Sequence, residues 1–238
     1  MDLRLIIALF CAISFGSAVS QSSEENSVES LEADNTSLFK WKDVSKKKKE
    51  LQHLIENKVQ PLLTDVHTST LELNSVLADI EQQKAGFENY KRELSENLKS
   101  LPQNCLTDDV VFHSNALNKW NFKDCGNFTD DCLYGAKLAL NGTIVAFKIG
   151  MTTSTIVVSV TDCPSWNVFK AYRCFESNIH AAIDLIDYIE KEGVPIIQRA
   201  VALAKKLPPD FKKCFGFANQ SKLMLYQSLN NAKCFSMI

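Results

Sequence analysis

The sequence predicts an all-α protein in which a long amphipathic, coiled-coil-like N-terminal helix precedes a disulfide-bonded helical domain. Apolar residues recur about every 3.5 positions between Ile55 and Leu101, the spacing of a helix with one apolar seam. The C-terminal half repeats isoleucine and leucine at steps of three and four residues, which also indicates helices. Only 8 glycines and 6 prolines occur in 238 residues, which argues against a turn-rich β fold.

The N-terminus resembles a secretory signal peptide covering residues 1–20. A short basic start at Arg4 is followed by the apolar run Leu5–Phe15 and then by small residues. The small-x-small pattern ending at Ser20 predicts cleavage before Gln21, and an uncleaved anchor is the alternative. The apolar run is shorter than the roughly 20 residues that a membrane span needs. We therefore expect a secreted, extracellular protein.

The next two segments differ in composition. Residues 21–37 are acidic and Ser-rich with almost no apolar residues, which predicts disorder. Residues 38–101 are the long helical region, with a kink or restart near Pro61. Its four-lysine run, Lys46–Lys49, is expected to be a solvated helix face rather than a site for anionic lipid or glycan.

The heptad seam of the long helix has one apolar and one mixed set of positions. One set is entirely apolar: Val59, Val66, Leu73, Ile80, Phe87, Leu94 and Leu101. The other is half polar: Ile55, Leu62, Ser69, Val76, Gln83, Tyr90 and Asn97. Two partners fit such a seam, a second copy in a coiled coil or the C-terminal helices of the same chain. Pro102 ends the helix.

All cysteines that remain after signal cleavage lie in residues 102–238, the predicted disulfide-rich domain. They are Cys105, Cys125, Cys132, Cys163, Cys174, Cys214 and Cys234. In an oxidising compartment they should pair, and an odd number leaves one thiol free or bridged to another chain. The sequence does not determine the connectivity.

The stretch CGNFTDDC, Cys125–Cys132, bears on the odd cysteine. It lacks the spacing of a zinc site or of a redox CxxC pair, and we expect scaffold disulfides around a glycosylated turn. Either Cys132 is the odd residue or it pairs with Cys125 across this short loop. A loop, favoured by Gly126, permits that bridge, and a continuous helix forbids it.

Helix boundaries in the C-terminal domain are expected at glycine and proline. Gly193 is expected to end one helix and Pro195 to open the next, which Pro208-Pro209 closes. Asp210 is a candidate cap for a further helix. Thr143–Val160 is rich in β-branched residues and follows the hairpin-like Asn141-Gly142, but its length favours a buried helix. Lys137 and Lys148 interrupt Ala136–Val160, so no second membrane span is expected.

Four sequons agree with export. They begin at Asn35, Asn127, Asn141 and Asn219. A glycan must project into solvent, so these positions are predicted to lie on the surface.

No catalytic, nucleotide-binding or metal-binding motif is present, and we expect neither an enzyme nor a cofactor. His53 and His67 lie on the long helix, and His113 lies in an expected loop. His180, one turn before Asp184, is an expected surface residue, since a dyad lacks a nucleophile beside it. The formal charge of −2 gives no electrostatic basis for binding nucleic acid.

A pocket for an apolar ligand is a separate hypothesis. It rests on the abundance of phenylalanine in the cysteine-rich domain. The candidates are Phe112, Phe122, Phe128, Phe147, Phe169, Phe175, Phe211, Phe215 and Phe217. Most of them are expected to be core residues.

The cysteine order, C-x19-C-x6-C-x30-C-x10-C-x39-C-x19-C, and the element CPSWNVFKAYRCFES beginning at Cys163 resemble the TsetseEP-like domain of insect secreted proteins. The likeness covers Cys105 to Cys234. It departs from the family in lacking a cysteine shortly before Cys163, where Thr155–Val160 stands, and Cys132 looks like an extra cysteine. The resemblance implies a helical, disulfide-bonded protein released into a secretion, with no catalytic residues to carry over.

We therefore expect a secreted, non-enzymatic glycoprotein that acts by binding an extracellular protein or glycan in gut fluid, saliva or venom. An effector that perturbs a host or prey target is one alternative. A carrier of a small apolar ligand is the other. Homo-oligomers would form through the long helix or through the odd cysteine.

Overall fold

The computed structural model describes residues 40–235, and these belong to one compact unit, Leu38–Ile238. The expected signal peptide, its cleavage between Ser20 and Gln21, the acidic segment 21–37 and the sequon at Asn35 lie outside the described residues. The described part of the chain contains helices and no strand, which confirms the all-α prediction.

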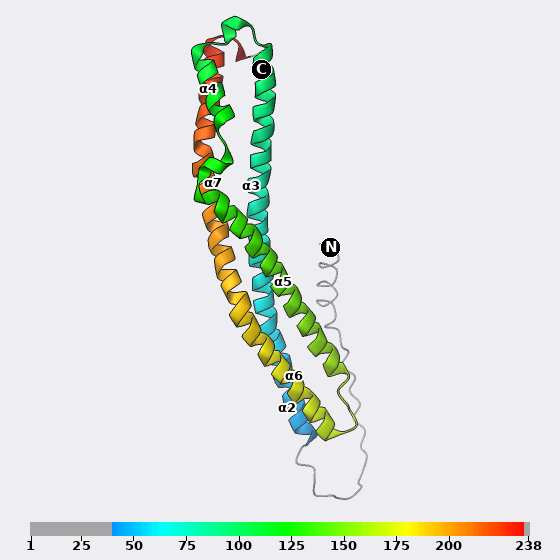
Figure 1. Ribbon diagram of the computed structural model, residues 1–238. Helices are drawn as coiled ribbons and strands as arrows, with labels where there is room; N and C mark the ends of the chain where they lie inside the picture. The colour runs from blue at the N-terminus through cyan, green and yellow to red at the C-terminus, as the bar shows by residue number, and fades with distance from the viewer. Residues whose placement is uncertain (1–39, 236–238) are drawn as a thin grey trace, which may run out of the picture. The chain divides into compact units, whose positions relative to one another are not determined.

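Three long helical limbs make up this unit (Figure 1). The first limb consists of α2 (Trp41–Leu54), the π-helical turn η1 (Ile55–Val59) and α3 (Gln60–Ser100). The second consists of α4 (Asp108–Lys119), the 3-10 turn η3 (Phe122–Cys125) and α5 (Asn127–Thr161). The third consists of α6 (Val168–Tyr188), the π-helical turn η4 (Ile189–Gly193) and α7 (Val194–Asn231). A further 3-10 turn, η2 (Gln103–Cys105), links the first limb to the second.

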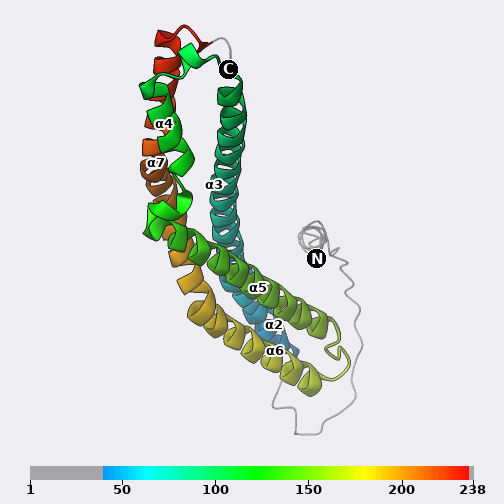
Figure 2. The same ribbon diagram turned by 45° about the horizontal axis from the view of Figure 1, so that its top comes forward.

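The first and third limbs run parallel to each other, and the second runs in the opposite direction. α2 packs along α6, and α3 packs along α7. α5 packs against α3, α6 and α7, whereas α4 packs mainly on α7 (Figure 2). The expected regions 38–101 and 102–238 are therefore parts of one helical bundle, and their boundary is the turn between α3 and α4.

Each parallel limb contains a proline just after a π-helical turn. Pro61 and Pro195 stand in the first turns of α3 and α7 and have no N–H to donate, and each follows directly on a wider π-helical turn. The preceding residues donate to carbonyls five positions back, Gln60 to Ile55 and Val194 to Ile189. At Pro61 the first limb stays helical from η1 into α3, and a kink there stays a prediction. The expected stop at Gly193 is wrong, because the chain stays helical through η4.

Several other expected breaks are helical in the structure. α7 continues through Pro208-Pro209, so Asp210 caps no separate helix. His113 lies in α4 and not in a loop. Thr143–Val160 is helical, as favoured, and Asn141-Gly142 forms no hairpin because it lies within α5. Packing of the limbs against one another outweighs these local signals.

The apolar seam of the long helix is buried against the other limbs of its own chain. All seven residues of its apolar set, from Val59 to Leu101, are buried, with exposures between 0% and 8%. Leu73 and Leu94 contribute to a core cluster with α4 and α7, and Val59 and Val66 contribute to one with α5 and α6. Of the two partners expected for this seam, the structure shows the C-terminal helices, so the seam is not available for a second copy.

Three disulfides join the limbs, with Cα–Cα distances of 5.8, 5.5 and 5.7 Å, which lie in the usual range. The pairs are Cys105–Cys234, Cys125–Cys214 and Cys163–Cys174. Among the described cysteines, Cys132 is the free one. The alternative bridge between Cys125 and Cys132 is not formed because α5 begins at Asn127, so most of the expected glycosylated loop is helix. Gly126, at φ +60°, makes the turn between the two.

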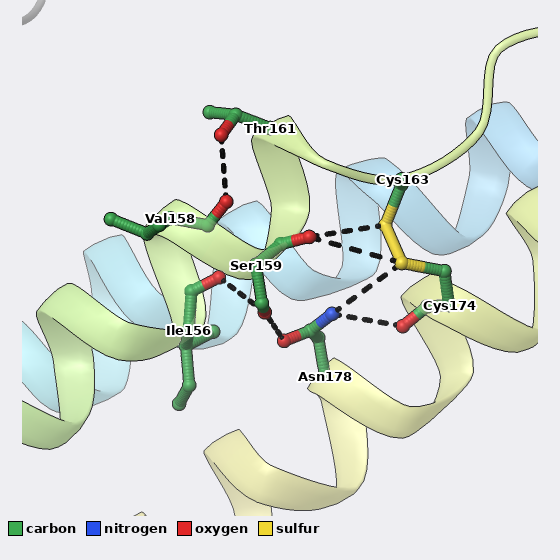
Figure 3. The surroundings of a disulfide bond; sticks show 7 residues. All are labelled: Ile156, Val158, Ser159, Thr161, Cys163, Cys174 and Asn178. Atoms are coloured by element: carbon green, nitrogen blue, oxygen red, sulfur yellow. Dashed lines mark hydrogen bonds between the residues drawn. A yellow bond between two sulfur atoms is a disulfide. The ribbon is translucent and has the colours of Figure 1, made fainter.

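The third disulfide closes the connection between α5 and α6 beside a small polar network (Figure 3). The Ser159 hydroxyl on α5 donates to the Asn178 amide oxygen on α6. The Asn178 amide nitrogen donates to the Cys174 carbonyl at 2.9 Å. The buried Asn178 therefore joins the end of α5 to the middle of α6, one helical turn beyond Cys174 of the Cys163–Cys174 bridge.

Candidate binding groove

A hollow of about 320 Å³ lies between α3 and α7. Its apolar lining consists of Val76 and Ile80 from α3 and Pro208, Phe211 and Phe215 from α7. Its polar lining consists of Asp79 and Gln83 from α3 and Lys212 and Asn219 from α7. A floor of apolar side chains with a few polar groups around it is typical of small-ligand sites, which start at about 300 Å³.

Helical spacing explains why each helix offers these residues on one side. On α3, Val76, Ile80 and Gln83 follow one another at steps of four and three residues. On α7, Pro208, Phe211 and Phe215 follow at steps of three and four. Each helix therefore brings its lining residues to one side, and the groove forms where these two sides face each other.

The aromatic wall of the groove is supported from behind. The rings of Phe211 and Phe215 are stacked with centroids 5.4 Å apart. Phe122, from η3, stacks on both, at 6.0 Å from Phe211 and 6.1 Å from Phe215. Phe87, on α3, meets Phe215 edge to face at 4.9 Å. Stacked and edge-to-face rings at these distances stabilise one another, so the wall is preformed.

A disulfide fixes this wall to the second limb. Cys214 lies directly before Phe215 and is bonded to Cys125 at the end of η3, the turn that also carries Phe122. The bridge therefore holds the two stacked sides of the aromatic cluster together. Pro208, at the other end of the α7 lining, has no N–H to donate within the helix, which locally weakens α7 where it borders the groove.

Two of the nine phenylalanines proposed for a ligand pocket line the groove, namely Phe211 and Phe215. The others divide into core and surface. Phe122, Phe128 and Phe175 are buried, whereas Phe112, Phe147, Phe169 and Phe217 are exposed. The pocket hypothesis is thus narrowed to a half-open groove between α3 and α7.

The predicted surface positions of the sequons are confirmed for the described part of the chain. Asn127 is the first residue of α5, Asn141 lies in its middle, and Asn219 lies on α7, and all three are exposed. Asn219 also lines the groove, so a glycan on it would stand at the entrance. Glycan occupancy stays a prediction.

The odd cysteine is half-buried on α5, with Glu81 and Lys84 of α3 as charged neighbours. Burial, with a smaller effect of the Asp131 and Glu81 carboxylates, raises the pKa of the Cys132 thiol to about 11. The thiol is therefore protonated at neutral pH, and it is the thiolate that acts as a nucleophile. Cys132 does not have the surroundings of a catalytic cysteine.

His53, His113 and His180 show no arrangement typical of a catalytic site. His53, on α2, lies within 3.0 Å of the Asn57 amide, and His113 stacks edge to face on Phe112. His180 and Asp184 are both exposed on α6. Among residues 40–235, no group of three or more His, Cys, Asp or Glu side chains could hold a metal ion.

One described helix, α5, is long and apolar enough to cross a membrane by length and composition alone. The two lysines within it, Lys137 and Lys148, do not exclude a span by that criterion, contrary to expectation. One face of α5 nevertheless packs against α3, α6 and α7, as in the core helix of a bundle. Only 22% of its most apolar stretch is buried, so much of its other face is open.

Sequence reasoning missed the groove because it combines two helices that are more than 120 residues apart along the chain. A signal existed on α3, where the mixed seam positions change from Val76 to Gln83. Both residues line the groove. No family model, curated protein or solved structure matches the chain. Its function is therefore argued from geometry.

Proposed function

We propose that this chain is an extracellular, non-enzymatic binding protein that holds a small amphipathic ligand in the groove between α3 and α7. The observation that carries the proposal is the groove itself, with a supported aromatic wall on one side and charged and amide groups beside it. Its volume, about 320 Å³, suits one aromatic or short aliphatic body.

The lining indicates the chemistry of the ligand. Phe211 is buried behind the groove, and the half-buried Phe215 and Val76 offer the apolar surface on which an aromatic or aliphatic body packs. The ammonium of Lys212 can pair with a carboxylate or sulfonate of the ligand, and the Gln83 amide can donate or accept a hydrogen bond. Asp79 balances the charge of Lys212, which favours a ligand with a localised charge over a polyanion.

The extracellular part of the proposal rests on the disulfides and the sequons. Three intramolecular disulfides are typical of extracellular proteins. The three described sequon asparagines are exposed and open to glycosylation. The resemblance of the cysteine order to TsetseEP-like domains supports release into insect gut fluid, saliva or venom. There the protein would encounter its ligand or a host target. Expression confined to one of these tissues would support that setting.

Anilinonaphthalene sulfonate, an aromatic anion whose fluorescence rises in apolar surroundings, is a suitable probe. The full secreted protein should bind one equivalent in the groove. Gln83→Trp should fill the space between α3 and α7 and weaken binding at least about tenfold, or about 1.4 kcal/mol. Gln82→Trp, at an exposed neighbouring position that does not line the groove, is the matched control and should bind as the wild type does.

The two variants separate a groove from general apolar exposure. Equal binding by the wild type, Gln83→Trp and Gln82→Trp would contradict the proposed site. Absence of binding by the correctly disulfide-bonded wild type to this probe and to short-chain fatty acids would contradict the proposed function.

A further inference from the structure

α5 carries two apolar faces, and one of them has no partner in the described part of the chain. The inner face is buried against the other limbs and includes Leu138, Val145 and Ile149. The outer face consists of six large side chains that are 47–62% exposed: Leu133, Leu140, Ile144, Phe147, Met151 and Val158. Solvent-exposed apolar patches of this extent mark interaction surfaces.

The outer face has the spacing of a coiled-coil seam. Its members, together with Lys137 and Ser154, follow one another at alternating steps of four and three residues from Leu133 to Val158. Six of these eight seam positions are thus large and apolar. The seam extends over 25 residue steps, about 37 Å of helix.

The seam is symmetric about a point between Val145 and Ala146. Ile144 and Phe147 lie at equal distances from that point, as do Leu140 and Met151, and as do Leu133 and Val158. When two copies of α5 are placed antiparallel about a two-fold axis through this point, each of these residues meets its counterpart in the other copy. An isologous dimer needs this kind of self-complementary surface.

The charges also favour the antiparallel arrangement. Lys137 and Lys148 are the charged residues between Leu133 and Val158. In the antiparallel register Lys137 meets Ser154 of the other copy. A parallel register would instead place Lys137 opposite Lys137 of the other copy. Like charges at facing positions are destabilising. Lys148 lies outside the seam with its ammonium 4.0 Å from the centre of the Tyr188 ring of its own chain.

The area is adequate for a dimer. If each of the six side chains loses about 100 Å², the two copies together bury about 1,200 Å², the lower end of the range for specific interfaces. We propose that the outer face of α5 binds a second copy of this chain in an antiparallel, non-covalent homodimer. This surface is separate from the lining of the α3–α7 groove, so the inference does not depend on the proposed ligand.

The dimer proposed here differs from one linked through the odd cysteine. Cys132 lies at one end of the seam and would face Ser159 of the other copy. The two Cys132 residues would then lie about 40 Å apart along the helices, far beyond disulfide reach. The dimer must therefore persist under conditions that leave no intermolecular disulfide, and it must persist when Cys132 is replaced by serine.

The first test is the mass of the full, disulfide-bonded protein in solution, measured by sedimentation or light scattering after any N-glycan has been removed, because Asn141 lies beside Leu140 and Ile144 of the seam. The wild type and Cys132→Ser are expected to be dimers. Ile144→Glu places two carboxylates beside the two-fold axis on an exposed position and should give monomers. Leu223→Glu, an equally exposed apolar residue on α7, is the matched control and should stay dimeric.

The second test is the register, in a Cys132→Ser background. Chains with Leu140→Cys mixed with chains with Met151→Cys should form a disulfide between unlike chains on mild oxidation. Leu140→Cys alone should not, since its two copies would be about 16 Å apart along the seam. A monomeric wild type would overturn the proposal, and so would a disulfide between two Leu140→Cys chains. A monomer that binds phospholipid vesicles, and loses binding in Ile144→Glu, would assign the face to a membrane instead.

Discussion

Cys125 and Cys214 are 89 residues apart in the sequence, and the disulfide between them brings their Cα atoms to 5.5 Å. The bond joins the turn before α5 to the part of α7 that carries Phe211 and Phe215. The bond therefore holds the turn between α4 and α5 against the aromatic wall of the candidate groove. A change that breaks it should affect both the stability of the fold and the proposed ligand site.

Removing this bridge should destabilise the protein and loosen the groove together. Replacing Cys125 and Cys214 by alanine should lower the free energy of unfolding by about 2–5 kcal/mol, because the unfolded chain gains the freedom of a long loop. Removing Cys163 and Cys174 should cost less, since only 11 residues separate them. Denaturant unfolding of both double variants checks this. A larger loss for the 163–174 pair would contradict it.

The long helix should contribute to stability as much as the disulfides do, because its seam lies in the core of the bundle. Leu73 is fully buried, and Leu73→Ala should cost about 2–5 kcal/mol. Leu71→Ala, two residues away on the exposed side of α3, should change the unfolding free energy by less than about 0.5 kcal/mol. Similar small losses for the two variants would mean that α3 does not pack on α5 and α7 as described.

Two glycines test how closely the limbs approach. A Cβ atom at Gly142 would overlap with the Thr70 hydroxyl oxygen on α3, so Gly142→Ala should destabilise by about 1–3 kcal/mol. Gly86 has nothing within 4 Å of a Cβ, and Gly86→Ala should stabilise α3 by about 0.5–1 kcal/mol. Thermal melting of both variants is the measurement.

A second variant tests whether the contact with Thr70 causes the destabilisation in Gly142→Ala. Adding Thr70→Ala to Gly142→Ala removes both of the Thr70 atoms that crowd the new methyl group. It should restore part of the melting temperature lost in Gly142→Ala. Failure to restore any of it would place the cause outside the contact between α5 and α3.

The Cys132 thiol should react slowly with alkylating reagents at neutral pH. Its pKa is raised to about 11, so the thiolate fraction should increase up to that pH, about two units above an ordinary thiol. Because the folded pKa lies above the unfolded one, the associated stability is present below about pH 9 and is lost as the pH rises through 11. A reaction rate that levels off near pH 9 in the native protein would contradict this, with Cys132→Ser as the blank.

Helix type and the buried seam could be predicted from the sequence because both follow from local periodicity. The seven apolar seam residues from Val59 to Leu101 are all buried as their spacing indicates. The continuation of the helix through Gly193 and Pro208-Pro209 could not be predicted, since packing against α3 and α5 offsets the cost of keeping these local stop signals inside a helix. Neither could the disulfide pairing, because Cys125 meets Cys214 only once the second and third limbs lie together.

Only part of the candidate groove could be predicted from the sequence. Phe211 and Phe215 were among the proposed pocket residues, but the sequence did not distinguish them from seven other phenylalanines. What distinguishes these two is the position of Val76 and Ile80 across the gap from α7, which depends on how α3 and α7 are aligned. That alignment is set by the whole bundle and by its bridges.

The most direct test of the proposed function is a methyl NMR titration of the full, disulfide-bonded protein with anilinonaphthalene sulfonate. The proposed site predicts that the methyl signals of Val76 and Ile80 shift in a saturable way, at one equivalent of probe. The signals of Ile144 and Val158, on the exposed face of α5, should stay unchanged. Shifts confined to Ile144 and Val158 would contradict a ligand site between α3 and α7.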